Sequence, residues 1–338
     1  MAFRCGLFGL VLLVAGAVQA TAASLTTQLT NTYSSFWAFG DSLSDPGNLF
    51  AATGGTTPAS PPYFQGRFSN GPVWAETLTG AFLSAGKAAG NFAFGGATAV
   101  TNADQIPDFQ TQALLYGANA APVAGPRPLA SVFFGANDLL DAFAANAGNP
   151  NAAASIAQAA VAAADAVGAG IAALAQTGIA DFAVWNLPDL GLTPRFALLS
   201  PPGSSQAGSA ATTLFNARLD QVLAGLSAQG LSISTVDTFG LFAQVRANPA
   251  AVGLTDTTLP CLFPDAASAA LFGQPQLCAP ATAATRLFFD TIHPNATAHG
   301  VMAANFVATV APVPLPATGL MLVAGLGVLA LRRRATLR

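Results

Sequence analysis

Short apolar runs that end at turns recur along the middle of the chain. Runs of this length, bounded by turn-forming residues, are typical of strands that are buried on both faces of a sheet. They predict strands at Ser35–Gly40, Ala130–Gly135, Asp181–Asn186 and Leu231–Val236.

Between these strands, apolar residues recur at steps of three and four, which is the spacing of one helix face. The pattern is clearest from Ile156 to Leu174, where Gly178 follows as a stop, and further helices are predicted at Ala211–Leu226 and Ala298–Val310. Strands separated by helices favour a parallel α/β sheet that helices cover on both faces. In such a sheet the active site lies beyond the carboxyl ends of the strands.

The first 23 residues have the layout of a secretory signal peptide. Arg4 precedes an apolar run, Leu7–Val18, and the small residues Ala20 and Ala22 form an Ala-x-Ala step. This order is typical of cleaved export signals, and the alternative is a buried N-terminal helix. We therefore expect an exported protein whose folded domain occupies residues 24–311.

The last 27 residues, 312–338, form a second targeting pattern. Val313–Ala317 reads Val-Pro-Leu-Pro-Ala, and the uncharged run Ala317–Leu331 leads to the three arginines at 332–334. As a helix this run spans roughly 22 Å, whereas a bilayer core is about 30 Å thick. The layout resembles the PEP-CTERM sorting signals of Gram-negative bacteria, which imply transient membrane association and cleavage by an exosortase-type enzyme. A permanent short transmembrane anchor is the alternative. In both cases the folded domain is expected to be extracellular or at the cell surface.

Composition narrows the class of protein further. The chain of 338 residues is 52% apolar and only 8% charged, which excludes disorder and allows a large core. Residues 24–311 contain seven basic and fifteen acidic residues, with Lys87 as the single lysine. No basic cluster is present in this range, which argues against nucleic acid as a partner.

Two cysteines remain after the signal peptide, Cys261 and Cys278. In an exported protein they are expected to form a disulfide, and a metal site is a poor alternative because no histidine lies near them. They lie in the segment Pro249–Pro280, which we interpret as an excursion beside the last motif of the chain. Thr53–Pro62, rich in Gly, Thr and Pro, is predicted to be a surface loop.

The first candidate for chemistry is Ser42, within the block Phe39–Asn48. A serine just past a buried strand, at a turn supported by Gly40, is a suitable place for an exposed nucleophile. The common Gly-x-Ser-x-Gly pattern is not matched. An ordinary capped turn, with the neighbouring aspartates and serines as caps, is the alternative.

Two further blocks offer groups that can bind an oxyanion. Asn91–Thr98 contains the adjacent glycines 95 and 96, which allow a backbone to approach a ligand closely. Phe133–Asp138 places Asn137 after a strand, where its amide can donate a hydrogen bond. A tight loop and a helix cap are the respective alternatives.

The fourth block, Asp290–Asn295, contains Asp290 and His293 three residues apart. One turn brings the carboxylate to one imidazole nitrogen, which fixes the tautomer and leaves the other nitrogen free to accept a proton. A structural Asp–His pair is the alternative. The second histidine, His299, has no carboxylate near it in sequence.

Together the blocks resemble those of the SGNH, or GDSL, hydrolase family, which supply Ser, Gly, Asn and His in this order. Gly66–Trp74 and Asn186–Gly191 also resemble segments of the branch with bacterial secreted esterases, phospholipase- or haemolysin-like proteins and plant GDSL lipases. The similarity extends from about Ser35 to Val310. It implies a flavodoxin-like three-layer α/β/α sandwich with a five-stranded parallel sheet, and hydrolysis of a lipid or other acyl ester without a metal or cofactor.

The resemblance also implies the role of each residue. Ser42 is the expected nucleophile, His293 the base, and Asp290 the group that orients the base. The oxyanion hole is expected from the N–H groups of Ser42 and Gly96 and the side chain of Asn137. The aspartates beside these motifs are expected to do no more than support them, namely Asp41, Asp45 and Asp138.

Two functions of other classes are compatible with this fold. An acyltransferase would use the same residues, with an acceptor alcohol in place of water. A non-catalytic surface binding module would keep the fold, and its expected mark is a lost nucleophile or histidine. Ser42 and His293 are both present.

Overall fold

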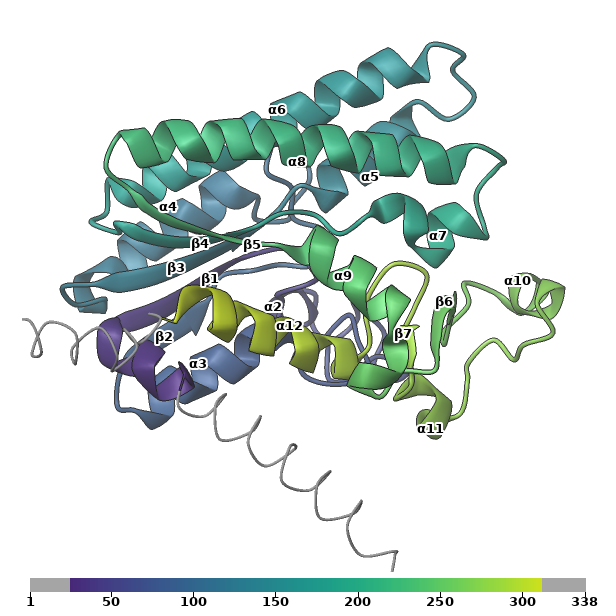
Figure 1. The fold of residues 1–338 in the computed structure, drawn as a ribbon, viewed down its shortest axis with the longest axis horizontal. Coiled ribbons are helices and arrows are strands. Elements are labelled where there is room, and N and C mark those ends of the chain that lie inside the picture. The colour runs from purple at the N-terminus through teal and green to yellow at the C-terminus, as the bar shows by residue number, and fades with distance from the viewer. Residues whose placement is uncertain (1–24, 312–338) are drawn as a thin grey trace, which may run out of the picture.

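The structure is a computed structural model that describes residues 25–311 (Figure 1). The expected signal peptide and the expected sorting signal lie outside the described residues. The described chain begins with a helical segment, residues 25–32, and ends just after the last helix.

Five parallel strands form the central sheet, in the order β2-β1-β3-β4-β5. The strands are β1 Ser35–Gly40, β2 Ala88–Asn91, β3 Pro128–Phe133, β4 Asp181–Trp185 and β5 Ser232–Val236. A second, two-stranded parallel sheet joins β6 (Asp256–Pro260) and β7 (Arg286–Phe288). The expected α/β fold with five parallel strands is confirmed.

Helices cover both faces of this sheet (Figure 1). One layer contains α4, α5, α6 and α8, and α3 and α12 lie on the opposite face. The α-helices are α2 Asn48–Ala52, α3 Trp74–Ser84, α4 Phe109–Asn119, α5 Ala136–Ala145, α6 Ala152–Ala175, α7 Pro194–Ala197, α8 Ser204–Ala228, α9 Thr238–Ala247, α10 Ala266–Leu271, α11 Pro280–Ala283 and α12 Ala296–Val310. Short 3₁₀ turns are η1 Ala121–Val123, η2 Leu190–Leu192 and η3 Pro249–Val252.

The predicted elements are present. Strand β1 has the predicted bounds, and the other elements have shifted ends. The strand expected at Ala130–Gly135 is β3, which stops at Phe133 because Gly135 turns the chain with a φ of +117°. The helix expected from Ala211 begins earlier, at Ser204, after Gly203 with a φ of +91°. Both glycines adopt the left-handed backbone that other residues avoid.

Strand β2 was not predicted. Its sequence is Ala-Ala-Gly-Asn, which has no apolar run, because it is an edge strand that pairs only with β1 and is half-buried along its length. Gly90 fits there because a Cβ would lie 2.8 Å from Trp37 Cζ3. The strands β6 and β7 also carry no distinct periodic pattern.

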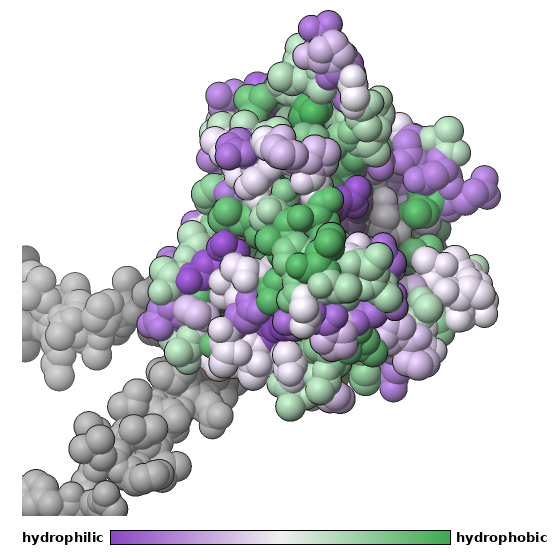
Figure 2. Space-filling model, turned by 90° about the vertical axis from the view of Figure 1, so that its right-hand side faces the viewer, coloured by the Kyte–Doolittle hydropathy of each residue, from purple (hydrophilic) through white to green (hydrophobic). Residues whose placement is uncertain are grey.

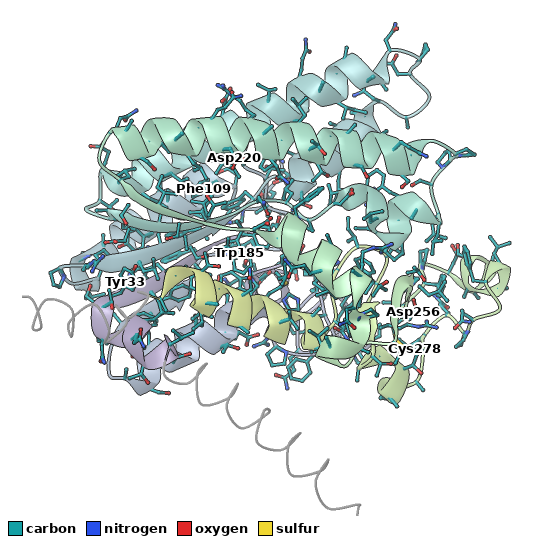
Figure 3. The ribbon with its side chains drawn as sticks, in the orientation of Figure 1. Tyr33, Phe109, Trp185, Asp220, Asp256 and Cys278 are labelled. Carbon is teal, nitrogen blue, oxygen red and sulfur yellow. A yellow bond between two sulfur atoms is a disulfide. The ribbon has the colours of Figure 1, made fainter. Side chains whose placement is uncertain are left out.

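Aromatic rings fill the layer between the sheet and the α3–α12 face. Trp74 packs against Trp185 with ring centroids 4.4 Å apart, and Trp185 stacks on Phe133 at 5.0 Å. Each buried indole N–H has an acceptor, Ser44 Oγ for Trp74 and Ser131 Oγ for Trp185. Figure 3 shows Trp185 in the centre of the molecule. These contacts make the sheet a rigid base for the loops at its carboxyl end.

We expect Gly208→Ala to destabilise the protein by about 1–3 kcal/mol, because overpacking forces the backbone apart. A Cβ at Gly208, on α8, would lie 2.9 Å from the Gly191 Cα. The matched control is Gly225→Ala on the same helix, where a Cβ would meet open space. That variant should stabilise the protein by about 0.5–1 kcal/mol. Urea unfolding measures both, and equal effects would contradict the close contact between α8 and η2.

Candidate active site

Ser42 lies two residues beyond β1, at the carboxyl edge of the sheet. Gly40 permits a close approach there, because a Cβ would lie 2.9 Å from the Phe133 carbonyl oxygen. The buried side chain of Gln112 accepts from the Gly40 N–H at 3.0 Å and donates to the Gly40 carbonyl at 2.9 Å. These contacts hold the turn that presents Ser42.

Three of the predicted residues form one hydrogen-bonded chain. His293 Nε2 lies 2.7 Å from Ser42 Oγ, and His293 Nδ1 lies 2.7 Å from Asp290 Oδ2. With Nδ1 protonated, the ring donates to the carboxylate and Nε2 accepts from the serine hydroxyl. This arrangement has the geometry of a nucleophile, its base and the group that orients the base.

Asp290 reaches His293 because residues 290–293 form a tight turn after β7. Asp290 Oδ1 accepts hydrogen bonds from the backbone N–H groups of Ile292 at 2.8 Å and of His293 at 2.7 Å. Burial alone would raise the pKa of Asp290, but the charge that His293 can carry and the hydrogen bonds outweigh it and lower that pKa. The carboxylate is therefore ionised beside the imidazole.

The three predicted oxyanion donors line the same cavity as Ser42. Neither the Ser42 nor the Gly96 N–H has a hydrogen-bond acceptor among residues 25–311. Gly96 has a φ of +84°, which favours glycine. One N–H of the Asn137 amide donates to the Ala97 carbonyl at 2.9 Å, and the other remains for a ligand. The three predicted groups thus come from the segment after β1, the loop after β2 and the first turn of α5, and all three residues line the cavity.

Comparison with known proteins identifies the family of this chain. The family model for GDSL-like lipases and acylhydrolases matches residues 36–306, most of the chain. The chain belongs to this family. The match includes all the blocks that the sequence analysis singled out.

Relatives with described activities or behaviour are also similar to this chain. Phosphatidylcholine-sterol acyltransferase of Aeromonas hydrophila is 33% identical over 237 residues, 66% of this chain and 64% of that protein. Thermolabile hemolysin of Vibrio parahaemolyticus is 28% identical over 276 residues, 79% of this chain and 61% of the hemolysin. Secreted effector protein SseJ of Salmonella typhimurium is 38% identical over 105 residues, 30% of this chain and 25% of SseJ. The chain therefore spans less than two thirds of the length of each relative.

Two buried aspartates fix the loop that carries Gly96, residues 95–100, in this GDSL-like chain. Asp45 accepts from the Gly95 N–H at 2.8 Å, and Asp138 on α5 accepts from both N–H groups of residues 99–100 at 2.9 Å. Burial raises the pKa of both carboxyl groups. Because the two aspartates hold the loop on either side of Gly96, they position it without facing a substrate.

Asp41 lies directly before Ser42 and lines the cavity. Its Oδ1 accepts from the Leu43 N–H at 3.0 Å, whereas Oδ2 is buried without a hydrogen-bond partner among the described residues. Burial raises the pKa of Asp41 to about 7, against the opposing effects of the Leu43 N–H and His293. In the folded protein the Asp41 carboxyl is therefore partly protonated near neutral pH.

His299 takes no part in the hydrogen-bonded chain. It is buried on α12, and its Nδ1 accepts from the backbone N–H of Trp74 at 3.3 Å. Burial lowers the pKa of His299 to about 3, so the ring is neutral at physiological pH. It ties α12 to the start of α3.

A cavity of about 390 Å³ opens in front of Ser42. Figure 2 looks at this end of the molecule, where apolar residues occupy the middle of the face. Arg195 and Arg246 also border the cavity. Most of its wall is apolar and comes from Leu49, Phe68, Ile106, Leu140, Leu190, Leu192, Phe239, Phe242, Ile292 and Met302.

Cys261 and Cys278 form a disulfide in the structure. The excursion that contains them is fastened to β7, the strand that leads to the turn Asp290–His293, because the Cys261 N–H donates to the Phe288 carbonyl at 3.1 Å. Figure 3 shows Cys278 at this end of the molecule, beside β7. The segment that carries the disulfide therefore supports the end of β7.

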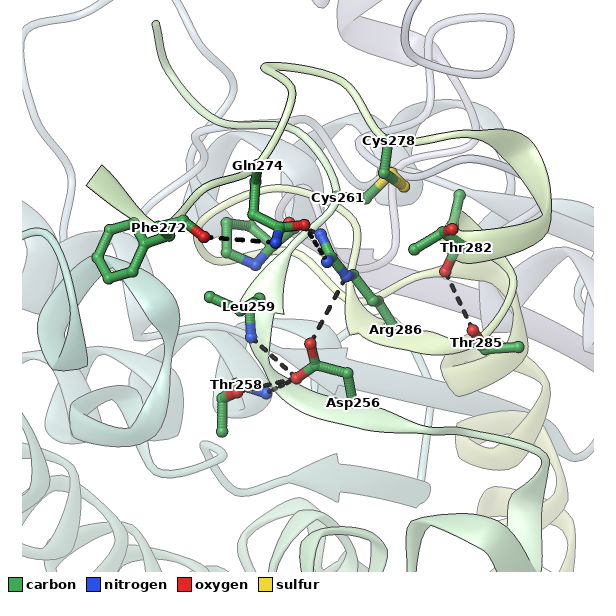
Figure 4. A network of polar contacts seen from close by, with 12 residues as sticks. Asp256, Thr258, Leu259, Cys261, Phe272, Gln274, Cys278, Thr282, Thr285 and Arg286 are labelled. Carbon is green, nitrogen blue, oxygen red and sulfur yellow. Dashed lines mark hydrogen bonds and ion pairs between the residues drawn. A yellow bond between two sulfur atoms is a disulfide. The ribbon is translucent and has the colours of Figure 1, made fainter. Parts of the chain in front are cut away.

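A buried arginine adds to this support (Figure 4). Arg286 donates to the Pro260 carbonyl and to Gln274 Oε1, each at 2.7 Å, and lies 3.6 Å from Asp256 Oδ2. Burial would raise the pKa of Asp256, but backbone N–H donors and Arg286 lower it. The network joins β6 and the disulfide segment to β7.

One residue of the site was not predicted. Tyr63 donates its hydroxyl proton to Asp290 Oδ2 at 2.6 Å. It follows the predicted loop Thr53–Pro62, whose composition indicates a surface turn and gives no sign of this contact.

The raised pKa of Asp41 has a consequence for stability. A carboxyl group with a raised pKa binds a proton on folding, so it weakens the fold progressively as pH rises from about 4, its unfolded pKa, toward about 7. We expect the stability of Asp41→Asn relative to wild type to increase over this range and to level off above it. Urea unfolding across the same range measures the difference. A difference that does not vary with pH would contradict the assignment.

Proposed function

We propose that the protein is an exported serine hydrolase that cleaves carboxylic esters through an acyl-enzyme on Ser42. The observation that carries the proposal is the pair of 2.7 Å contacts that link Ser42, His293 and Asp290. Membership of a lipase and acylhydrolase family supports ester chemistry. Ester hydrolysis by this route needs only a nucleophile, a base and an oxyanion hole.

In the first half of the reaction, His293 Nε2 accepts the Ser42 proton while the serine oxygen attacks the acyl carbonyl. Asp290 stabilises the imidazolium that forms. The negative oxygen of the tetrahedral intermediate lies between the N–H groups of Ser42 and Gly96 and the Asn137 amide, which bind it more tightly than the neutral carbonyl. The imidazolium then protonates the leaving alcohol.

In the second half, water replaces the alcohol. His293 takes a proton from the water, and the resulting hydroxide attacks the acyl-serine. The same oxyanion donors act again, and the proton returns to Ser42 as the acid leaves. Each cycle consumes one water and one ester, releases an alcohol and an acid, and restores the enzyme.

The substrate class follows from the cavity. The wall next to Ser42 is mostly apolar and would bind an acyl chain by removing it from water. We therefore propose lipid or other acyl esters as substrates.

An acyltransferase is the second candidate, favoured by the acyltransferase of Aeromonas hydrophila. The two reactions share the acyl-enzyme and differ only in whether water or an alcohol attacks it. Turnover of a soluble ester with increasing concentrations of a competing alcohol distinguishes them. Free acid as the main product supports the hydrolase, and acyl transfer that dominates at low alcohol concentration supports the transferase.

The proposed location is outside the cytoplasm. The signal-peptide layout of residues 1–23 supports export, and relatives named as a hemolysin and a secreted effector are consistent with it. Residues 312–338 are proposed to be a sorting signal that is removed after transient membrane association. Catalysis then resides in residues 24–311.

Ser42→Ala should lower kcat by about four orders of magnitude or more, because no other group can form the acyl-enzyme. Ester hydrolysis with a chromogenic short-chain substrate measures it, and circular dichroism checks the fold. The matched control is Ser227→Ala, at an exposed position on α8, which should leave turnover unchanged. Substantial turnover in Ser42→Ala would overturn the proposed mechanism.

The C-terminal proposal is tested in a Gram-negative host that processes such signals. Mass spectrometry of the mature protein should recover peptides up to about residue 311 and none from Leu320 onward. A protein that consists of residues 24–311 should be soluble and as active as the processed form. Recovery of the arginines at 332–334 from the mature surface protein would instead indicate a permanent anchor.

A further inference from the structure

Tyr63 lies against the catalytic turn from a distant part of the chain. Its ring meets Phe68 and Phe289 edge to face, with centroids 5.8 and 5.3 Å away. Phe68 in turn lies 5.0 Å from the His293 ring, and Phe289 immediately precedes Asp290. The ring therefore has a fixed place among the side chains that support the acid and the base.

The Tyr63 hydroxyl completes the hydrogen bonding of Asp290. Oδ2 accepts from the Tyr63 hydroxyl at 2.6 Å and from His293 Nδ1 at 2.7 Å. Oδ1 accepts from the two backbone N–H groups of residues 292 and 293. Each carboxylate oxygen thus has two donors, which fixes the plane of the carboxylate as well as its position.

The phenol is held as a donor. Burial raises the pKa of Tyr63, and the negative charge of Asp290 raises it further. The hydroxyl therefore keeps its proton at neutral pH and remains a hydrogen-bond donor to Asp290.

We propose that Tyr63 is a positioning residue, which acts through Asp290 to orient His293 and to moderate the charge that the imidazole meets. This inference rests on the proposed function of the Ser42 site. The hydroxyl shares Oδ2 with the His293 ring, so part of the negative charge on that oxygen is balanced by the tyrosine. Without it, the carboxylate is freer to turn and holds a proton on the imidazole more strongly.

Several groups face His293 and bear on its protonation. Asp290 is its direct partner, and Tyr63 acts on it through that carboxylate. Asp41 lies close enough for its charge to interact with the imidazole, and His299 is a buried neutral ring behind it. Because Asp41 also titrates near neutral pH, the profiles below are recorded both with Asp41 present and in an Asp41→Asn background.

The test is Tyr63→Phe, which removes one oxygen and keeps the ring between Phe68 and Phe289. With a soluble short-chain ester, kcat should fall about tenfold while KM stays within about twofold, since the acyl site is untouched. The acid limb of kcat/KM should move to higher pH in both backgrounds. The matched control, Tyr116→Phe, changes a buried tyrosine that packs on Trp37 and Phe39, and should alter neither quantity.

Unchanged kcat and an unmoved acid limb in folded Tyr63→Phe would overturn the proposal. Should this variant not fold, 3-fluorotyrosine at position 63 keeps the ring and makes the hydroxyl a stronger donor. The acid limb should then move to lower pH, and an unmoved limb would again overturn the proposal. Ser42→Ala is measured alongside: if it retains turnover, the proposed function fails, whereas an inactive Ser42→Ala with an unaffected Tyr63→Phe refutes only the role of the tyrosine.

Discussion

A carboxylate removed from water needs hydrogen-bond donors on both oxygens, and the site is organised around this need at Asp290. Two donors come from its own turn, one from His293 and one from Tyr63. Only a satisfied, ionised carboxylate at this point can hold the imidazole in the tautomer that accepts the Ser42 proton. The hydrogen-bonded chain therefore depends on three packed chain segments, which carry Ser42, Tyr63 and the turn Asp290–His293.

The segments that carry Ser42 and Asp290 are supported by different parts of the fold. Ser42 follows a central strand whose last residue is fixed by the sheet and by Gln112. Asp290 follows the short strand β7, which pairs outside the central sheet. The disulfide segment and the buried Arg286 compensate, because they join β7 to β6 and limit movement at the end of β7 that leads to His293. The segment that contains the disulfide and the turn Asp290–His293 are therefore held together through β7.

Much of the fold and of the candidate site could be predicted from the sequence, because both depend on local sequence patterns. Buried strands show as apolar runs, and the polar residues of the family blocks lie shortly after strand ends. Ser42 is two residues beyond β1, and Asn137 is in the first turn of α5, which follows β3. Strand β2 was missed because an edge strand needs no apolar run. Tyr63 was missed because its contact with Asp290 joins residues 227 positions apart, and no local pattern reports such a contact.

The most direct test of the account is the crystal structure of the enzyme after reaction with an alkylphosphonate ester. Phosphorus should be bonded to Ser42 Oγ, with the phosphoryl oxygen within about 3.1 Å of the N–H groups of Ser42 and Gly96 and of the Asn137 amide nitrogen. The alkyl chain should lie along the apolar wall of the cavity. A phosphoryl oxygen that points away from these donors, or phosphorus bonded to another residue, would contradict the account.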